Sequence, residues 1–412
     1  MSPERLRILH VAPMPASPPR FGAQARMHGL MTELAQRHDV TAVVLVDDEF
    51  NIEECRQAMG AYCRDVVAVA NPNGQRPLGK RLLQARSLAS TQSFERLRAM
   101  APALQQHLDN ILRAERFDIT NLEFTFQGHL NLRQAPPGER LPSLIVDSHN
   151  IDFDLARQYS LRGSLGRRLY HLINWPKLRR EELATYRNAD GVFLCSAADE
   201  QRLLNLTPET RTTVIPNAAD VEYYQPRAGD PPSDGRTVVF FGHLSYMPNV
   251  DGVAYFVRDI WPRIAASHPE ARCKIIGSSP SPSVLALQGP RIEVTGFVPD
   301  LRPHLAAAAA VVVPLRLGGG TRLKIVEAMA MGKAVVSTSL GAEGIEAIKG
   351  RDILVEDGAT AFADAVNRLL AEANLAARIG QSARRLAVER YAWTGAARAL
   401  EAFYRRIRAA ST

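Results

Sequence analysis

The sequence has 412 residues, of which 46% are hydrophobic and 23% are charged; this is the balance of a globular protein with two or three domains and excludes a disordered or fibrous chain. The 50 Lys and Arg residues exceed the 43 Asp and Glu residues by 7, an excess that suits an anionic substrate or an acidic membrane surface but that also serves plain solubility. The four cysteines lack CxxC spacing and no apolar run reaches the length of a bilayer span, so we expect reduced thiols in a cytoplasmic protein, either soluble or peripherally bound at the inner membrane face.

The first half of the chain alternates short runs of Val and Ile with longer amphipathic stretches, which predicts strands and helices wound into a parallel sheet. The apolar runs of this half lie at residues 7–13, 40–46, 65–70, 117–124, 143–150, 191–196 and 212–217. The same alternation resumes in the second half, at residues 237–242, 273–278, 292–297, 309–315, 334–338 and 352–357.

Between the two halves, residues 216–236 are rich in Pro, Gly and Asp and break both periodicities, which predicts a linker. We therefore expect an α/β protein with one doubly wound domain at 1–215 and a second at 237–389. Ligands of such open sheets bind at the carboxyl ends of the strands. After Trp393 a helical apolar period runs to the end of the sequence, so we expect a last helix within 390–412.

Three consecutive glycines, Gly318–Gly320, stand between an apolar run and an amphipathic stretch. Bare backbone amides next to the positive end of a helix are typical of a phosphate-binding turn. We expect Thr321 to cap this helix and Arg322 and Lys324 to lie in its first turn, where cations oppose the helix dipole unless an anion is bound nearby. The alternative is a flexible loop with a Lys324–Glu327 pair on the surface.

The stretches 240–252, 274–277, 294–301 and 318–338 together resemble the family 4 retaining glycosyltransferases of GT-B fold. The resemblance implies two Rossmann-like domains facing across a cleft, a C-terminal domain that binds a nucleotide-sugar, and a last helix, 390–412, that crosses back to the first domain. It also implies that the Glu327 carboxylate holds the ribose hydroxyls of the donor. The donor-binding residues expected from the resemblance are Gly22, Gly242, His243, Gly296, Phe297, Val298, Gly319, Gly320, Thr321, Arg322, Lys324 and Glu327.

The sequence departs from the family pattern at two places. The family motif has a first Glu where this chain has Gly319, and it tends to carry an Arg and a Lys near the first strand of the second domain, where this chain has Gly242 and His243. The two phosphates of the donor still require positive charge as the leaving group departs. We expect Arg322 and Lys324 to supply it, without a metal or another cofactor.

In the first domain, the resemblance places His149 beside the donor sugar, where it is the catalytic candidate. Glu123 follows another strand and is a candidate contact for the acceptor; a solvated loop acid is the alternative. Asp152 and Asp154 have the Asp-x-Asp spelling of metal-dependent transferases, but acids at this spacing also favour the start of a helix, and we expect no metal there.

Residues 157–187 contain eight basic and two acidic residues with aromatic side chains between them. This composition suits an anionic membrane surface, with residues 76–87 as a second basic stretch. The alternative is a packed helix whose aromatic side chains lie in the core and whose arginines lie in water. No recognised nucleic-acid-binding motif accompanies the charge.

These observations predict a metal-independent, retaining glycosyltransferase that moves a sugar from a nucleotide-diphosphate donor to a glycan or lipid-linked acceptor in cell-envelope or polysaccharide biosynthesis. The alternative is a non-catalytic nucleotide-sugar-binding or epimerase-like protein of the same fold, which the Gly319 and His243 departures keep open. The donor sugar, the acceptor and the oligomeric state cannot be inferred from the residues.

Overall fold

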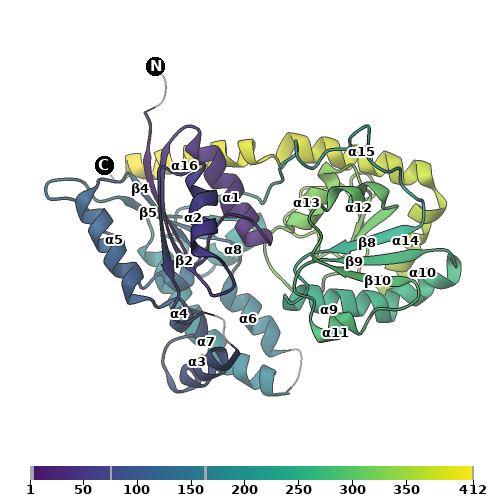
Figure 1. Ribbon diagram of the computed structural model, residues 1–412, viewed down its shortest axis with the longest axis horizontal. Coiled ribbons are helices and arrows are strands. Elements are labelled where there is room, and N and C mark those ends of the chain that lie inside the picture. The colour runs from purple at the N-terminus through teal and green to yellow at the C-terminus, as the bar shows by residue number, and fades with distance from the viewer. Residues whose placement is uncertain (1–3, 75–76, 162–164, 411–412) are drawn as a thin grey trace. The chain divides into compact units, whose positions relative to one another are not determined.

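Parallel strands form the centre of both halves of the chain. A computed structural model describes residues 4–74, 77–161 and 165–410 and divides into two units, one running to Ile215 and resuming at Ala396, the other covering Pro216–Gly395 (Figure 1). Among the described residues the first unit holds a seven-stranded sheet and the second a six-stranded sheet, and the paired strands of both are parallel. The predicted class, α/β with two doubly wound parallel sheets, is confirmed.

The first sheet has the strand order β3-β2-β1-β4-β5-β6-β7, so the direction of winding reverses between β1 and β4. Its strands are β1 (Arg7–Ala12), β2 (Asp39–Val46), β3 (Asp65–Ala70), β4 (Ile119–Glu123), β5 (Ser143–Ser148), β6 (Gly191–Leu194) and β7 (Thr212–Val214). The helices of this unit are α1 (Gly22–Ala35), α2 (Ile52–Gly60), α3 (Pro77–Ala89), α4 (Phe94–Ala99), α5 (Pro102–Ala114), η1 (Thr125–Gln127), α6 (Asp152–Ser160), α7 (Leu165–Asn188) and α8 (Ala197–Leu204).

The second sheet has the order β10-β9-β8-β11-β12-β13 and reverses between β8 and β11. Its strands are β8 (Thr237–Phe241), β9 (Arg272–Ile276), β10 (Ile292–Gly296), β11 (Ala310–Val313), β12 (Val335–Ser337) and β13 (Leu354–Val355). The helices that follow them are α9 (Met247–Tyr255), η2 (Phe256–Ile260), α10 (Trp261–Ser267), α11 (Pro282–Leu285), α12 (Arg302–Ala307), α13 (Leu323–Ala330), α14 (Ala359–Ala371) and α15 (Ala373–Arg390).

The central strands are buried on both faces, as is usual for parallel sheets covered by helices. Apolar residues fill most of these positions, which explains why apolar runs indicate the strands. Strands β4 and β5 nevertheless bury Asn121, Glu123 and Asp147. Buried polar groups of this kind are costly unless they are hydrogen-bonded, so their partners identify a specialised region.

The stretch 216–236 contains no regular helix or strand among its described residues, in keeping with its Pro and Gly content, and it packs with the second unit. The last helix, α16 (Trp393–Ala410), belongs to the first unit from Ala396 onward. There the Tyr404 hydroxyl donates to Asn121 Oδ1 over 2.9 Å, and Arg408 pairs with Asp118 over 2.8 Å. No helix in the described part of the chain is long and apolar enough to cross a membrane.

Candidate functional site

The glycine-rich turn lies at the reversal point of the second sheet, where open α/β sheets bind their ligands. Strand β8 pairs directly with β11; Gly242 follows β8, and Gly318–Gly320 follow β11 after a short connection. Gly242, Gly318 and Gly320 have φ of +148°, +131° and +67°, in the region where side chains are strained. The sequence therefore places glycine where the turn between strand and helix needs this backbone.

A second reason for glycine at two of these positions is the space taken by cationic side chains. A Cβ at Gly242 would lie 2.8 Å from Lys324 Nζ and 3.0 Å from Asn249 Nδ2, and a Cβ at Gly318 would lie 2.8 Å from Arg322 Nη2. Contacts this short require something to shift. The bare backbone thus lets the two cations fold in against the turn.

Arg322 does not lie in the first turn of the helix, as predicted, but is the residue that precedes it. Helix α13 begins at Leu323, Arg322 is its extended N-cap, and no side chain caps it, so the predicted Thr321 cap is wrong. The reason is the buried Arg322 guanidinium, which donates to the carbonyl oxygens of Gly319 and Gly320 and, over 3.3 Å, to that of Leu340. These bonds hold the backbone extended and make Arg322 a support of the turn.

Lys324 is the second residue of α13 and points to Gly242. Its ammonium donates to Asn249 Oδ1 over 2.7 Å and lies 4.2 Å from the centroid of the Phe240 ring. Burial, and then the nearby Arg322 cation, lower the pKa of Lys324 to about 7. An ammonium with a neutral hydrogen-bond partner at a helix N-terminus is well suited to an anionic ligand, which would raise its pKa again.

Asn249 connects Lys324 to His243. The Asn249 amide donates to the His243 carbonyl oxygen over 2.8 Å. The His243 ring lies between two hydroxyls, with Nδ1 2.9 Å from Ser278 Oγ and Nε2 2.8 Å from Ser245 Oγ. His243 and Lys324, two of the predicted donor-binding residues, are therefore in one hydrogen-bonded group, and Gly242 lies beside Lys324.

Glu327 lies one turn after Lys324 on the same helix. Burial raises the pKa of Glu327 to about 7, opposed by the Lys324 charge and by a hydrogen bond from Tyr224. Both Glu327 and Lys324 are half-buried, so the alternative of a solvated surface pair is wrong. Tyr224 comes from the 216–236 stretch, and no pattern in the sequence indicates that this residue reaches the helix.

The remaining predicted donor residues of this unit lie on the loop after β10. Gly296 ends this strand with φ +73°, and its carbonyl oxygen accepts from the Gly277 amide over 2.9 Å. Phe297 is 68% exposed and Val298 is half-buried. This loop follows the edge strand of the sheet, because β10 is two strands from β8. It presents an exposed aromatic ring at the same carboxyl edge of the sheet.

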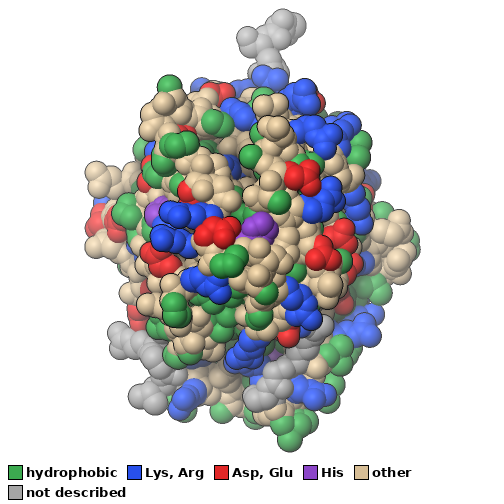
Figure 2. Space-filling model, turned by 90° about the vertical axis from the view of Figure 1, so that its right-hand side faces the viewer, with side chains coloured by type: hydrophobic (Ala, Val, Ile, Leu, Met, Phe, Trp, Pro, Cys, Tyr) green, Lys and Arg blue, Asp and Glu red, His purple; other side chains and the backbone are tan. Residues whose placement is uncertain are grey.

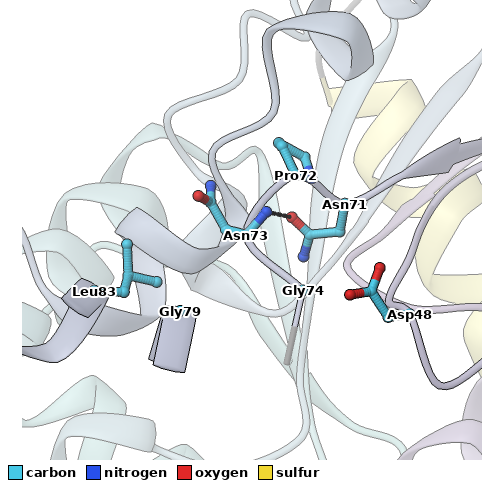
Figure 3. Close-up of a pocket in the computed structure, with 7 residues that line it drawn as sticks. All are labelled: Asp48, Asn71, Pro72, Asn73, Gly74, Gly79 and Leu83. Atoms are coloured by element: carbon cyan, nitrogen blue, oxygen red, sulfur yellow. Dashed lines mark hydrogen bonds between the residues drawn. The ribbon is translucent and has the colours of Figure 1, made fainter. Parts of the chain in front are cut away.

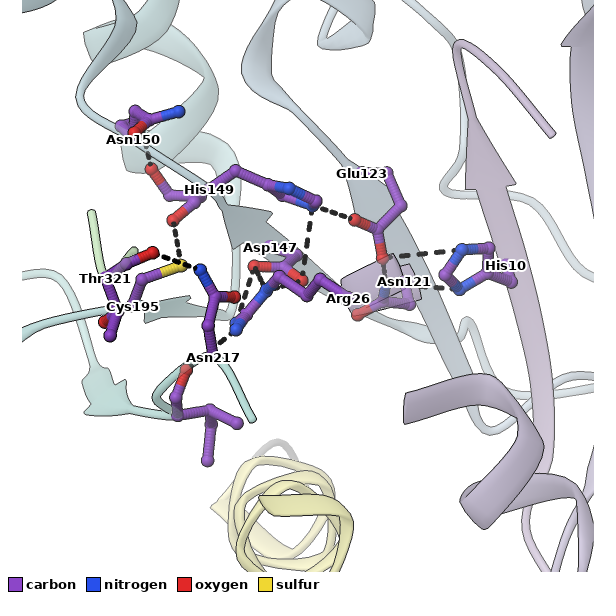
Figure 4. A network of polar contacts seen from close by, with 12 residues as sticks. His10, Arg26, Asn121, Glu123, Asp147, His149, Asn150, Cys195, Asn217 and Thr321 are labelled. Atoms are coloured by element: carbon purple, nitrogen blue, oxygen red, sulfur yellow. Dashed lines mark hydrogen bonds and ion pairs between the residues drawn. The ribbon is translucent and has the colours of Figure 1, made fainter. Parts of the chain in front are cut away.

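In the first unit, a buried polar network joins the carboxyl ends of β4 and β5 (Figure 4). His149 follows β5, and its Nε2 lies 2.6 Å from Oε2 of Glu123, the last residue of β4. The His149 ring stacks on Phe124 with a centroid separation of 4.1 Å. Glu123 is 1% exposed, so the alternative of a solvated loop acid is wrong, and its carboxylate fixes the His149 ring.

Arg26 and Asp147 form the charged centre of this network. The Arg26 guanidinium contacts both Asp147 oxygens, with Nε 2.8 Å from Oδ2 and Nη2 3.0 Å from Oδ1, and it also donates to the Ile215 carbonyl oxygen over 2.9 Å. Both side chains are almost completely buried. Asp147 Oδ2 lies 3.5 Å from His149 Nε2, so the ion pair and the histidine form one cluster.

The second oxygen of Glu123 accepts from the Asn121 amide over 2.8 Å and lies 3.4 Å from His10 Nε2. Burial, and then the Asp147 charge, raise the pKa of Glu123 to about 7, and His149 opposes the shift. Burial lowers the pKa of His10 to about 3, so that ring is neutral. Glu123 can therefore exchange a proton near neutral pH while it contacts His149.

The described residues contain one group of three side chains with metal-ligand geometry, Glu123, Asp147 and His149, whose ligand atoms lie within 4.8 Å of one another. Arg26 already supplies a cation to this group through its bidentate contact with Asp147. Asp152 is not part of it and lies in the first turn of α6, where its backbone amide donates to the Glu182 carboxylate. The arrangement is that of a charge-balanced hydrogen-bonded network.

The other predicted residue of this unit, Gly22, is exposed and is the first residue of α1, four positions before Arg26. The sequence prediction missed Arg26 and Asp147. A signal for both was present: Arg26 shares a helix face with apolar Met27 and Leu30, and Asp147 interrupts an otherwise apolar strand. Charged residues at core positions of this kind usually have a buried partner.

A separate cavity of about 340 Å³ lies at the carboxyl ends of β2 and β3 (Figure 3). Its lining residues are Asp48, Asn71, Pro72, Asn73, Gly74, Gly79 and Leu83. The Asn73 amide donates to Asn71 Oδ1 over 3.0 Å, and Asn71 in turn donates to Asp47 over 2.7 Å. None of the predicted site residues lines this cavity.

Two family descriptions match the chain, one on each half. "Glycosyl transferase 4-like domain" matches residues 21–218, and "Glycosyl transferases group 1" matches residues 235–372. The two matches include every predicted site residue. Comparison with curated proteins finds no match.

Solved structures share the fold over nearly the whole chain. A sucrose-phosphate synthase from Thermosynechococcus elongatus is 18% identical with a TM-score of 0.73, covering 98% of this chain and 100% of its own. HepE from Anabaena, solved with UDP and glucose, is 16% identical with a TM-score of 0.65, covering 97% and 99%. The catalytic domain of starch synthase IV from Arabidopsis thaliana, bound to ADP and acarbose, is 13% identical with a TM-score of 0.65, covering 98% and 100%. These likenesses confirm the predicted GT-B fold.

Proposed function

Since this chain belongs to the group 1, family 4-like glycosyltransferases, which transfer a sugar from a nucleotide-sugar donor, we propose that it does so with retention, without a metal, and onto a glycan or lipid-linked acceptor of cell-envelope or polysaccharide biosynthesis. The observation that carries the metal-independent part is the position of Lys324. Its ammonium lies at the N-terminus of α13, beside Gly242 and at the reversal point of the sheet. A departing nucleoside diphosphate is stabilised by donors and charges already in place, which a helix N-terminus and an ammonium supply.

The donor is expected to bind along the carboxyl edge of the second sheet. In this proposal, the Glu327 carboxylate accepts from the ribose hydroxyls, the Phe297 ring and the Gly296–Val298 backbone receive the base, and the turn Gly319–Arg322 holds the sugar and the diphosphate. Burial raises the pKa of Glu327 to about 7, so hydroxyl groups that donate hydrogen bonds to its carboxylate would stabilise the ionised form. Gly22 is assigned to the donor phosphates by family resemblance alone.

His149 is proposed to contact the donor sugar during transfer. The hydrogen bond between His149 Nε2 and Glu123 Oε2 and the stacking on Phe124 fix the ring, which is what a group that must meet a short-lived transition state requires. Glu123, expected as an acceptor contact, is better described as a positioning residue, because its two oxygens already contact His149 and Asn121. We assign no carboxylate as a nucleophile, so retention is proposed to occur on one face of the sugar through an ion pair.

The first test is turnover with and without a chelator. We expect the protein to release nucleoside diphosphate from at least one member of a donor panel that starts with UDP-glucose and ADP-glucose, given a cell-envelope lipid extract as acceptor. The rate should be unchanged in EDTA, because Lys324 and the α13 amides replace a metal. Loss of turnover in EDTA that manganese restores would contradict the metal-independent proposal and point to Glu123, Asp147 and His149 as ligands.

A second test separates donor binding from chemistry. Glu327→Ala removes hydrogen bonds to a charged acceptor and should weaken donor binding by about 1.5–3 kcal/mol, measured as Kd by calorimetry. His149→Ala should leave the donor Kd within about twofold and lower kcat by about tenfold or more, the effect of one lost hydrogen bond in the transition state. Unchanged donor affinity in Glu327→Ala would show that the ribose contact is assigned to the wrong residue.

A further inference from the structure

Helix α7 exposes an apolar stripe along its first half. Leu165, Leu169, Leu172 and Ile173 are between 47% and 69% exposed, and their spacing of four, three and one residues puts them on one face of the helix. Such a face is normally buried, because each exposed leucine or isoleucine forgoes the gain from leaving water. Within the described residues this stripe therefore remains largely exposed.

The neighbouring helix α3 adds to this surface. Its Leu82 and Leu88 are 72% and 45% exposed. The two helices lie side by side at one end of the first unit, where the Ser87 and Tyr170 hydroxyls are 3.0 Å apart and Lys177 Nζ donates to the Ser87 carbonyl oxygen over 2.6 Å (Figure 1). We call the exposed apolar residues of these two helices the α3–α7 surface: Leu82, Leu88, Leu165, Leu169, Leu172 and Ile173.

The charged residues of α3 and of the first part of α7 all have one sign. Helix α3 carries three Lys or Arg residues and residues 165–180 carry five, whereas neither stretch contains an Asp or a Glu. All eight side chains are exposed or half-buried. Elsewhere the charges mix: Figure 2 shows blue and red side chains interspersed over the middle of the face it views, with green and blue next to each other at the lower edge.

The composition of residues 157–187 allows two interpretations, a membrane-binding surface and a packed helix. In the structure each interpretation fits a different half of α7. Leu178, Leu183 and Tyr186, in the second half of α7, are buried in the core. Tyr159, Tyr170 and Trp175 are half-buried, so the aromatic side chains are not the exposed apolar group that the composition suggested. The exposed apolar side chains are instead the leucines in the first half of α7.

We propose that the α3–α7 surface docks on a membrane whose lipids are anionic. Leucines that enter the headgroup region, surrounded by Lys and Arg that meet lipid phosphates, are the two components of interfacial binding. A second copy of this chain does not fit. In a two-fold dimer the Lys and Arg residues around the surface of one copy would face the same residues of the other copy and repel them. An enzyme bound to the membrane in this way would be able to reach a lipid-linked acceptor. This last step rests on the proposed function.

The test is sedimentation with vesicles of phosphatidylcholine alone and with about a third phosphatidylglycerol, without donor or acceptor. We expect binding to the anionic vesicles at low salt and its loss at high salt, because the attraction falls off within a Debye length. Two variants should each lower the partition coefficient by about tenfold or more. The serine variant combines Leu165→Ser, Leu169→Ser, Leu172→Ser and Ile173→Ser. The charge-reversal variant combines Arg167→Glu, Arg168→Glu, Arg179→Glu and Arg180→Glu.

The matched control replaces three apolar side chains of similar exposure elsewhere, Leu141→Ser, Leu285→Ser and Ile348→Ser, which are 49%, 48% and 53% exposed. It should bind as the unmodified protein does. No binding to anionic vesicles at low salt, equal binding to neutral vesicles, or equal binding by the serine variant would each overturn the proposal. A dimer in light scattering that the serine variant converts to monomer would assign the surface to a second copy instead. Turnover with a water-soluble acceptor should survive both variants, so failure here is distinct from failure of the proposed function.

Discussion

Lys324→Met is expected to lower kcat/KM for the donor by about 10²–10³, the effect of removing one preorganised charge from a transition state that develops negative charge. Methionine keeps most of the length of the side chain, so the packing around Gly242 and Phe240 is largely preserved. The loss should appear mainly in kcat, since the diphosphate carries its greatest charge as the sugar leaves. Steady-state kinetics over a range of donor concentrations measure it.

Lys324→Met should also change the number of protons that the protein takes up when the donor binds. The free protein holds Lys324 with a pKa of about 7, and a bound diphosphate would raise it, so binding above pH 7 takes up a proton and weakens as the pH rises. Glu327, whose pKa is also about 7, acts in the opposite sense, because ribose hydroxyls favour its ionised form and donor binding releases its proton. At pH 8 Glu327 is largely ionised already, so the uptake there comes from Lys324. Calorimetry in buffers of different ionisation enthalpy should show close to one proton in the unmodified protein and almost none in Lys324→Met.

Lys333→Met is the matched control for this prediction. Lys333 lies beyond the other end of α13, where its ammonium donates to the Ala306 carbonyl oxygen over 2.9 Å and burial also lowers its pKa. This variant should keep kcat/KM within about threefold and the proton uptake at pH 8. Equal losses in both variants would mean that any buried lysine near α13 matters for stability alone and that Lys324 does not face the diphosphate.

The elements of the fold could be predicted because their signals are local. Each apolar run overlaps one of the strands, since a parallel strand covered on both faces needs consecutive apolar residues. Strand order is different: β1 lies between β2 and β4, and β8 between β9 and β11, through pairings between distant segments that no local pattern encodes. The reversal points that locate the candidate sites therefore became visible only in the structure.

The candidate site was predictable to the same extent. Glu123 ends β4 and His149 directly follows β5, so their proximity follows from a parallel sheet. The Thr321 cap failed because Arg322 turns back onto the carbonyl oxygens of its own loop, a choice that depends on three-dimensional space at Gly318. Arg26 and Asp147 are 121 residues apart in the sequence. The sequence indicates that each charged residue needs a buried partner but does not indicate which residue that partner is.

Arg26→Met is expected to destabilise the first unit by about 3–5 kcal/mol, the largest effect on stability that we predict for a single substitution. The buried pair is worth little by itself, because taking both charges out of water offsets their attraction. Removing one partner is costly because the Asp147 carboxylate remains buried without its counter-charge, and the Ile215 carbonyl oxygen loses a donor. Urea unfolding followed by circular dichroism measures the loss, and hydrogen exchange of peptides covering β4 and β5 assigns it to the first unit.

A double-mutant cycle distinguishes the lost charge balance from lost packing. Asp147→Asn alone should also destabilise, but Arg26→Met combined with Asp147→Asn should be more stable than Arg26→Met, because the uncompensated carboxylate is gone. Arg56→Met, which breaks an exposed pair with Glu53 over 3.0 Å in the same unit, should cost less than about 1 kcal/mol. If Arg26→Met cost no more than Arg56→Met, or if the double variant were no more stable than Arg26→Met, the Arg26 charge would not be what balances Asp147. In that case a bound cation would be the better explanation for how Glu123, Asp147 and His149 share one buried space.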